Sequence, residues 1–112
     1  MFHYPYQGYE NLFLPFKQCC EVLDKLIKLK REGYPIDNSI PCLQALKDNS
    51  WNCHDWQVLN VESDGQINQG CYVKNRGEIS CQRCGFACYA EWSLAYEGVR
   101  ESIEIWTKVL SW

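Results

Sequence analysis

The spacing of apolar residues predicts two helices in the first half of the chain. Between residues 16 and 32, apolar side chains recur every three or four positions, and charged side chains occupy the opposite face. This period matches one face of an α-helix, and Gly33 is well suited to follow its last turn. A second, shorter helix is expected to run to about Asp48, with Asn38 or Ser39 as its capping residue. The two form an N-terminal helix pair.

The pattern changes in the second half, where it predicts a β-hairpin followed by helices. Two short runs with β-branched and aromatic residues lie within residues 56–73 and flank an Asp64-Gly65 turn. Glycine supplies the positive φ that such a turn needs, so this is a strong hairpin signal. Helical spacing returns after Phe86, with Gly98 as a break. Two stripes on these helices are expected to be buried: Tyr89, Trp92 and Tyr96, and then Ile103, Trp106 and Leu110.

Composition and charge exclude several classes of function. At 112 residues the chain is one domain at most, and its net charge of −3 leaves no basic surface for nucleic acid or anionic membranes. No apolar run approaches the roughly 20 residues that cross a bilayer. The first residues, MFHYPYQGYENLF, have neither the basic nor the apolar region of a signal peptide. We therefore expect a cytoplasmic protein without nucleic-acid or membrane partners.

The eight cysteines are the strongest chemical signal in the sequence. In a reducing compartment, closely spaced cysteines more often bind metal than form disulfides. A C-x-x-C turn supplies two thiolates, and a hairpin with its entry can supply two more, so we expect four ligands from three places. The predicted ligands are Cys53, Cys71 on the second hairpin strand, Cys81 and Cys84, with Cys88 as a replacement for one of the last two. Both a Cys₄ zinc site and a [4Fe–4S] cluster fit this spacing.

The sequence also allows other roles for the cysteines. A disulfide framework, buried thiols and a thiol–disulfide oxidoreductase using Cys81 and Cys84 are the alternatives, although the last lacks a thioredoxin-like pattern. Cys19, Cys20 and Cys42 lie on the predicted helices and are interpreted as small core residues. His54 neighbours the first ligand and is expected to point away from the metal.

The cysteine spacing around a hairpin resembles the auxiliary-cluster region at the C-terminus of radical SAM enzymes, the SPASM and shorter twitch domains. In that family a cysteine precedes a hairpin, a second follows its turn, and a C-x-x-C comes later, before a helix. Upstream, LIKLKREGYPIDNSIPCLQAL resembles the last helix and turn of a radical SAM barrel. The resemblance covers most of residues 10–97. The matching positions are Cys53-x-x-Trp56, Asp64-Gly65, Cys71, Cys81-x-x-Cys84 and Cys88.

The resemblance implies that one auxiliary [4Fe–4S] cluster relays an electron or acts as a structural staple. Its ligands would be Cys53, Cys71, Cys81 and Cys84. Arg83 and the amides around Gly85 would tune its potential. The fold expected is α+β: the helix pair, a hairpin around the metal site, and C-terminal helices. Residues 1–50 would correspond to the end of the barrel and residues 51–112 to the SPASM/twitch-like domain.

The sequence departs from complete radical SAM enzymes in one decisive respect. The C-x-x-x-C-x-x-C motif that holds the SAM-cleaving cluster is absent, because CQRCGFAC has the two spacings in the opposite order. The barrel that binds SAM would also need roughly 200 residues ahead of this chain. We therefore expect no catalysis by this chain alone. The partner expected is a radical SAM barrel, as a missing N-terminal part or a separate subunit, together with a redox partner. A zinc-binding protein-interaction module is the alternative function.

Overall fold

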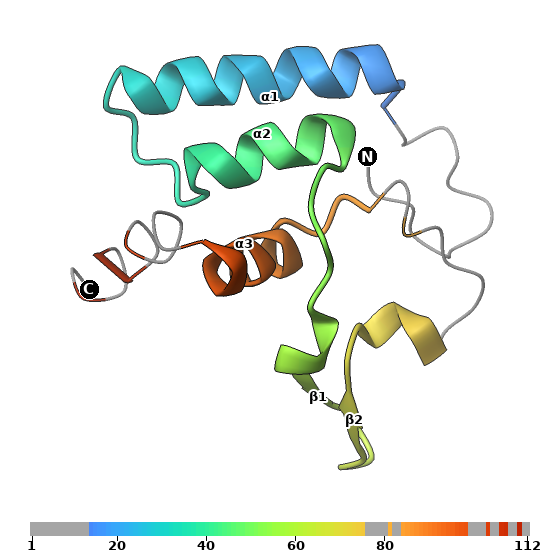
Figure 1. The fold of residues 1–112 in the computed structure, drawn as a ribbon. Helices are drawn as coiled ribbons and strands as arrows, with labels where there is room; N and C mark the ends of the chain where they lie inside the picture. Colours follow the sequence, from blue (N-terminus) through green and yellow to red (C-terminus); the bar gives the residue numbers. More distant parts are fainter. Residues whose placement is uncertain are drawn as a thin grey trace.

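The computed structural model describes residues 14–75, 81, 84–98, 103, 106, 107 and 110. In this part of the chain, three longer helices and one two-stranded antiparallel hairpin form a small α+β domain, as predicted (Figure 1). Arg83, predicted to tune a cluster, lies outside the described residues. None of the helices in the described ranges combines the length and apolar character needed to cross a bilayer.

The N-terminal helix pair is confirmed. Helix α1 spans Phe16–Arg31, and Gly33 follows it with a φ of 94°, a conformation that glycine adopts at little cost. Helix α2 spans Ile40–Asp48. Its cap is Ser39, whose hydroxyl accepts a hydrogen bond from the backbone N–H of Cys42 at 3.1 Å.

The main core lies between α1 and α2. Leu23 and Ile27 from α1 pack with Leu43 from α2. Cys42 is fully buried, as its interpretation as a core residue required, and Cys19 packs at the edge of the same cluster. Cys20 is half-buried, and its thiol donates to the backbone carbonyl of Lys47. These contacts all join residues from the first half of the chain.

Helix α3, Ala87–Glu97, packs against α2 on the side away from α1 (Figure 1). The carboxylate of Glu91 accepts hydrogen bonds from the backbone N–H of Ser39 and from the side-chain amide of Asn38. The Cys42 thiol donates to the backbone carbonyl of Ala87. Gly98 follows the last turn of α3, where the sequence predicted a break.

The hairpin is shorter than predicted. Strands β1, Leu59–Val61, and β2, Ile67–Gln69, pair antiparallel, with Asn60 opposite Asn68. Short 3-10 helices replace the outer parts of the predicted strands: η2 at Asp55–Gln57 and η3 at Tyr72–Asn75. Cys71 therefore lies just after the second strand and not on it. The Asp64-Gly65 turn is confirmed, with a φ of 84° at Gly65.

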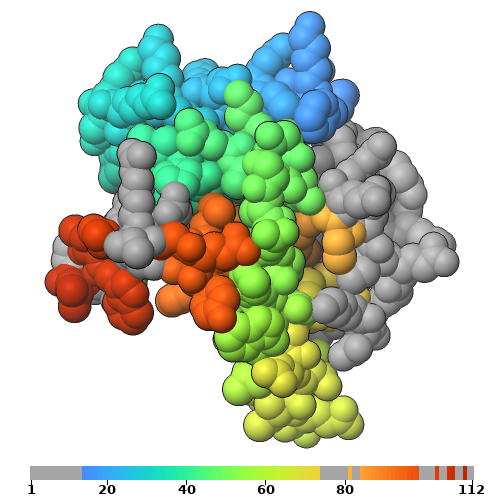
Figure 2. Space-filling view, viewed as in Figure 1, coloured from blue at the N-terminus to red at the C-terminus, as the bar shows by residue number. Residues whose placement is uncertain are grey.

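The prediction that both aromatic stripes are buried is wrong for most of their members. Tyr89 is buried, but Trp92 and Tyr96 on the same helix are exposed. The second stripe is exposed at Ile103, Trp106 and Leu110. The hairpin also projects from the helices (Figure 2), and it carries exposed Leu59, Val61 and Ile67. The reason is geometric: among the described residues, α3 packs mainly on α2 and touches η2 with one edge, and the hairpin has only two strands, so each keeps an open face.

Candidate metal centre

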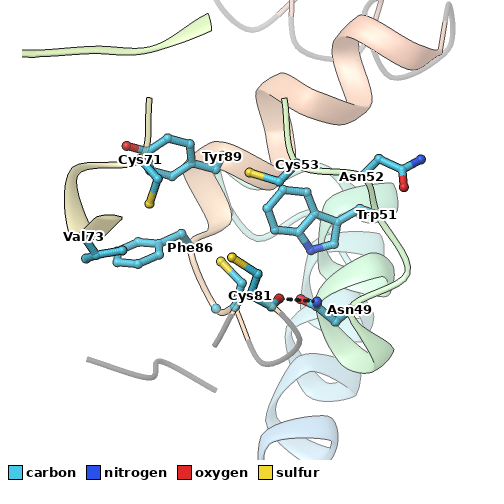
Figure 3. Close-up of a pocket in the computed structure, with 11 residues that line it drawn as sticks. Asn49, Trp51, Asn52, Cys53, Cys71, Val73, Cys81, Phe86 and Tyr89 are labelled. Carbon is cyan, nitrogen blue, oxygen red and sulfur yellow. Dashed lines mark hydrogen bonds between the residues drawn. The ribbon is translucent and has the colours of Figure 1, made fainter. Parts of the chain in front are cut away.

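The four cysteines predicted as ligands line one pocket. Cys53 comes from the loop between α2 and η2, Cys71 from the end of the hairpin, and Cys81 and Cys84 from the segment before α3. Figure 3 shows the sulfur atoms of the first three directed into the same space. Three separate segments thus deliver thiols to one place, as the spacing predicted.

The pocket has a volume of about 350 Å³, which is room for several water molecules and for more than a single ion. Its walls are largely aromatic and apolar, and Phe86 and Trp51 stand on opposite sides of the space in Figure 3. No group of three or more His, Cys, Asp or Glu side chains in the described ranges is arranged closely enough to hold one metal ion. The remaining lining residues are Asn49, Asn52, Val73, Gly85 and Tyr89.

Cys71 is positioned by Asp55. The Asp55 carboxylate accepts a hydrogen bond from the backbone N–H of Cys71 at 2.8 Å. Gly70 makes this approach possible: its φ is +101°, and a Cβ atom there would lie 2.9 Å from a carboxylate oxygen of Asp55. The contact joins the segment that follows Cys53 to the end of the hairpin. It therefore brings two predicted ligands, distant in sequence, to one side of the pocket.

Cys53 is positioned by α3. The backbone N–H of His54 donates to the hydroxyl of Ser93, which is buried, at 2.8 Å. The His54 ring is paired with Glu97 at 2.8 Å and does not line the pocket, so the prediction that it points away is confirmed. The ring also stacks at a tilt on Tyr96, with centroids 4.8 Å apart.

Cys81 is positioned by the end of α2. The side-chain amide of Asn49 donates to the backbone carbonyl of Cys81 at 2.8 Å (Figure 3). Asn49 ends α2 in the left-handed conformation, with a φ of 59°, which asparagine tolerates better than most residues. The backbone N–H of Cys84 donates to the carbonyl of Cys81 at 3.3 Å, so the backbones of these two cysteines are directly joined. Cys88 is exposed on α3 and does not line the pocket.

The surroundings of two of the pocket's thiols, Cys53 and Cys84, raise their pKa values. Burial raises the pKa of the Cys53 thiol to about 11, and the Asp55 carboxylate and Cys84 act in the same direction. Burial also raises the pKa of Cys84, to which Cys71 and Cys81 add. The sulfur atoms are therefore close enough to feel one another's charge. A bound metal cation reverses this balance, because a coordinating thiol is deprotonated.

Two unpartnered polar atoms belong to residues that line the pocket beside the four cysteines. Trp51 and Asn49 both line it, and the indole nitrogen of the first and the side-chain oxygen of the second are buried and have no hydrogen-bond partner. Neither residue was assigned to the site from the sequence. The only available signal was a Trp two residues before the first predicted ligand.

Comparisons with known proteins do not assign the chain to a family. No family model matches it, and no solved structure matches it. Curated relatives include the alanine–tRNA ligases of two strains of Ehrlichia ruminantium, Gardel and Welgevonden, each 28% identical over 79 residues. The alignment covers 63% of this chain and 9% of each ligase, so the chain spans less than a tenth of these relatives.

Proposed function

We propose that this chain binds one [4Fe–4S] cluster as the auxiliary-cluster domain of a radical SAM-type protein. The observation that carries the proposal is the convergence of four cysteines from three segments on one pocket. Cysteine thiolates are the usual ligands of such clusters, and four of them fill the coordination of one cluster. The ligands are Cys53, Cys71, Cys81 and Cys84.

The pocket suits a cluster better than a single zinc ion. A closed zinc site holds four sulfurs about 2.3 Å from one atom, which leaves no space between them. Here the four cysteines line a pocket of about 350 Å³. Val73, Phe86 and Tyr89 give that pocket an apolar wall. Such a shell governs the potential of a bound centre.

When bound, the cluster would supply one-electron transfer or structural cross-linking. The chain's own residues hold and shield it: the cysteines bind iron, and the contacts of Asp55, Ser93 and Asn49 keep the three segments in place. With four cysteine ligands, no iron position is left for a substrate. A radical SAM barrel and a redox partner are therefore the partners we propose for catalysis.

The test is anaerobic reconstitution of the full chain with iron and sulfide, followed by counts of both elements and by absorbance. We expect a brown protein with about four irons and four sulfides per chain, as the cluster formula requires, and broad absorption near roughly 400 nm. Alanine variants of each of the four ligands should lose most of the bound iron. Anaerobic handling matters, because zinc can occupy a cluster site in protein made in air.

Two variants serve as controls. Cys88→Ala should retain the cluster, since Cys88 is exposed outside the pocket, and Cys20→Ala should behave like the wild type. Loss of iron in Cys88→Ala with retention in Cys81→Ala or Cys84→Ala would show that Cys88 replaces one of those ligands. A colourless protein with one zinc and no sulfide would overturn the proposal in favour of a zinc-binding interaction module.

A further inference from the structure

A buried indole N–H lies beside the cysteine pocket without an acceptor. Trp51 precedes Cys53 by two residues, and its Nε1 atom is shielded from solvent and makes no hydrogen bond with the described residues. A buried donor without a partner destabilises the folded state, and most buried polar groups in native proteins have a hydrogen-bond partner. In Figure 3 the indole stands at the side of the space into which the cysteine sulfurs point. A group that fills this space would bring acceptors to this side of the pocket, where the Oδ1 atom of Asn49 is the other unpartnered acceptor.

Three other polar side chains of the pocket, Asn49, Asn52 and Tyr89, each make at least one hydrogen bond. The hydroxyl of Tyr89 accepts from the backbone N–H of Tyr72 at 3.3 Å. The side-chain amide of Asn52 donates to Glu97 at 3.1 Å, and that of Asn49 donates to Cys81. Among these side chains, Trp51 is the one whose buried nitrogen donor makes no hydrogen bond with the described residues.

We propose that the Nε1–H group of Trp51 donates a hydrogen bond to a sulfur atom of the cluster in this pocket and raises its reduction potential. The inference rests on the proposed function. Cluster sulfurs carry negative charge and accept hydrogen bonds, and such bonds are among the factors that set the potential. The reduced cluster is the more negative state, so a donor stabilises it more than the oxidised state. Trp51 is therefore a tuning residue, not a ligand.

One competing acceptor is present in the pocket. The Oδ1 atom of Asn49 is also buried and unpartnered, and a rotation of the indole could pair the two groups. In that arrangement Trp51 would serve only to fix the loop after α2. The cluster would then have the same potential with or without the indole N–H.

The first measurement is the reduction potential of the reconstituted full chain. Trp51→Phe keeps an aromatic ring and removes the donor, so we expect a shift to more negative potential with unchanged iron and sulfide content. Trp92→Phe is the matched control: Trp92 is half-exposed on α3 and does not line the pocket, so its potential should equal that of the wild type. A wild-type potential in Trp51→Phe would overturn the inference.

The second measurement does not depend on the folding of the variant. In protein with ¹⁵N-labelled tryptophan, the Trp51 indole resonance is assigned by its loss in Trp51→Phe, or by elimination with the other four Trp→Phe variants. We expect cluster incorporation to shift this resonance strongly and to slow exchange of its proton. A resonance that is the same with and without the cluster would point to Asn49 and overturn the inference.

Different results would overturn the proposed function and the inference about Trp51. A chain that takes up no iron and sulfide overturns the proposed function and this inference together. A chain that forms the cluster but shows an unchanged potential and indole resonance overturns the inference about Trp51 and leaves the proposed function standing.

Discussion

The carboxylate of Asp55 accepts a hydrogen bond from the backbone N–H of Cys71, 16 residues further along the chain, at 2.8 Å. This contact closes the base of the hairpin. It ties the loop that carries Cys53 to the segment that carries Cys71, so the spacing of two proposed ligands depends on one side chain. The hairpin itself contributes only two strands of three residues. Asp55 is therefore a better target than the strands for testing how the site is held.

We expect Asp55→Ala to destabilise the fold by about 1–3 kcal/mol, because it leaves a partly buried N–H without its acceptor. Iron binding in reconstitution should fall as well. The control is Asp64→Ala at the hairpin tip, which removes only a local bond to the N–H of Gln66 and should cost about 0.5 kcal/mol. Urea unfolding of both variants gives the comparison, and equal losses would contradict the role of Asp55.

Two glycines with positive φ offer a matched pair. Gly65 has a φ of +84° and open space around the position of a Cβ atom, whereas at Gly70 that atom would lie 2.9 Å from Asp55. Gly65→Ala should cost about 1–2 kcal/mol through backbone strain alone. Gly70→Ala should lower the free energy of unfolding by that amount and by about 1 kcal/mol more, because it displaces the Asp55 hydrogen bond. The free energies of unfolding test this order, and a smaller loss in Gly70→Ala would contradict it.

The interaction of Glu97 with His54 predicts a dependence of stability on pH. Hydrogen bonds from His54 and then from Asn52 lower the pKa of the Glu97 carboxyl below its usual 4.5. A lowered pKa means that this contribution is present above pH 4.5 and is lost as the pH falls through the folded-state value. The melting temperature of Glu97→Gln should therefore lie below that of the wild type at pH 6 and approach it near pH 3. A difference that grows on acidification would contradict the assignment.

Metal removal should separate the two halves of the domain. Binding free energy at a metal site is folding free energy, and the described residues between 53 and 88 include few buried apolar side chains. Chelation of iron should therefore abolish amide protection in β1 and β2. Helix α1 should keep its protection, since its contacts with α2 do not involve the pocket. Hydrogen exchange followed by NMR measures amide protection in the hairpin and in α1. Protected hairpin amides after chelation would contradict the prediction.

Much of the fold was predictable because its signals are local. The period of α1 and the Ser39 cap of α2 each depend on residues within one or two turns, and the Asp64-Gly65 turn depends on two neighbours. The hairpin was predicted too long because β-branched and aromatic content does not show where a strand ends. The length of the strands is limited at Asp55. Its carboxylate accepts a hydrogen bond from the backbone N–H of Cys71, while η2 turns away from the strand.

The sequence by itself reduced the thiols that can meet to five. The order and spacing of Cys53, Cys71, Cys81 and Cys84 around one turn allow these four to reach one place, with Cys88 as a replacement for one of the last two. Only the tertiary structure decided what surrounds them. It placed Trp51 at the pocket, turned His54 towards Glu97 and left Cys88 exposed. These outcomes follow from contacts between residues that lie tens of positions apart, such as that between His54 and Ser93. No local period encodes such contacts, because they form only after the helices and the hairpin have packed.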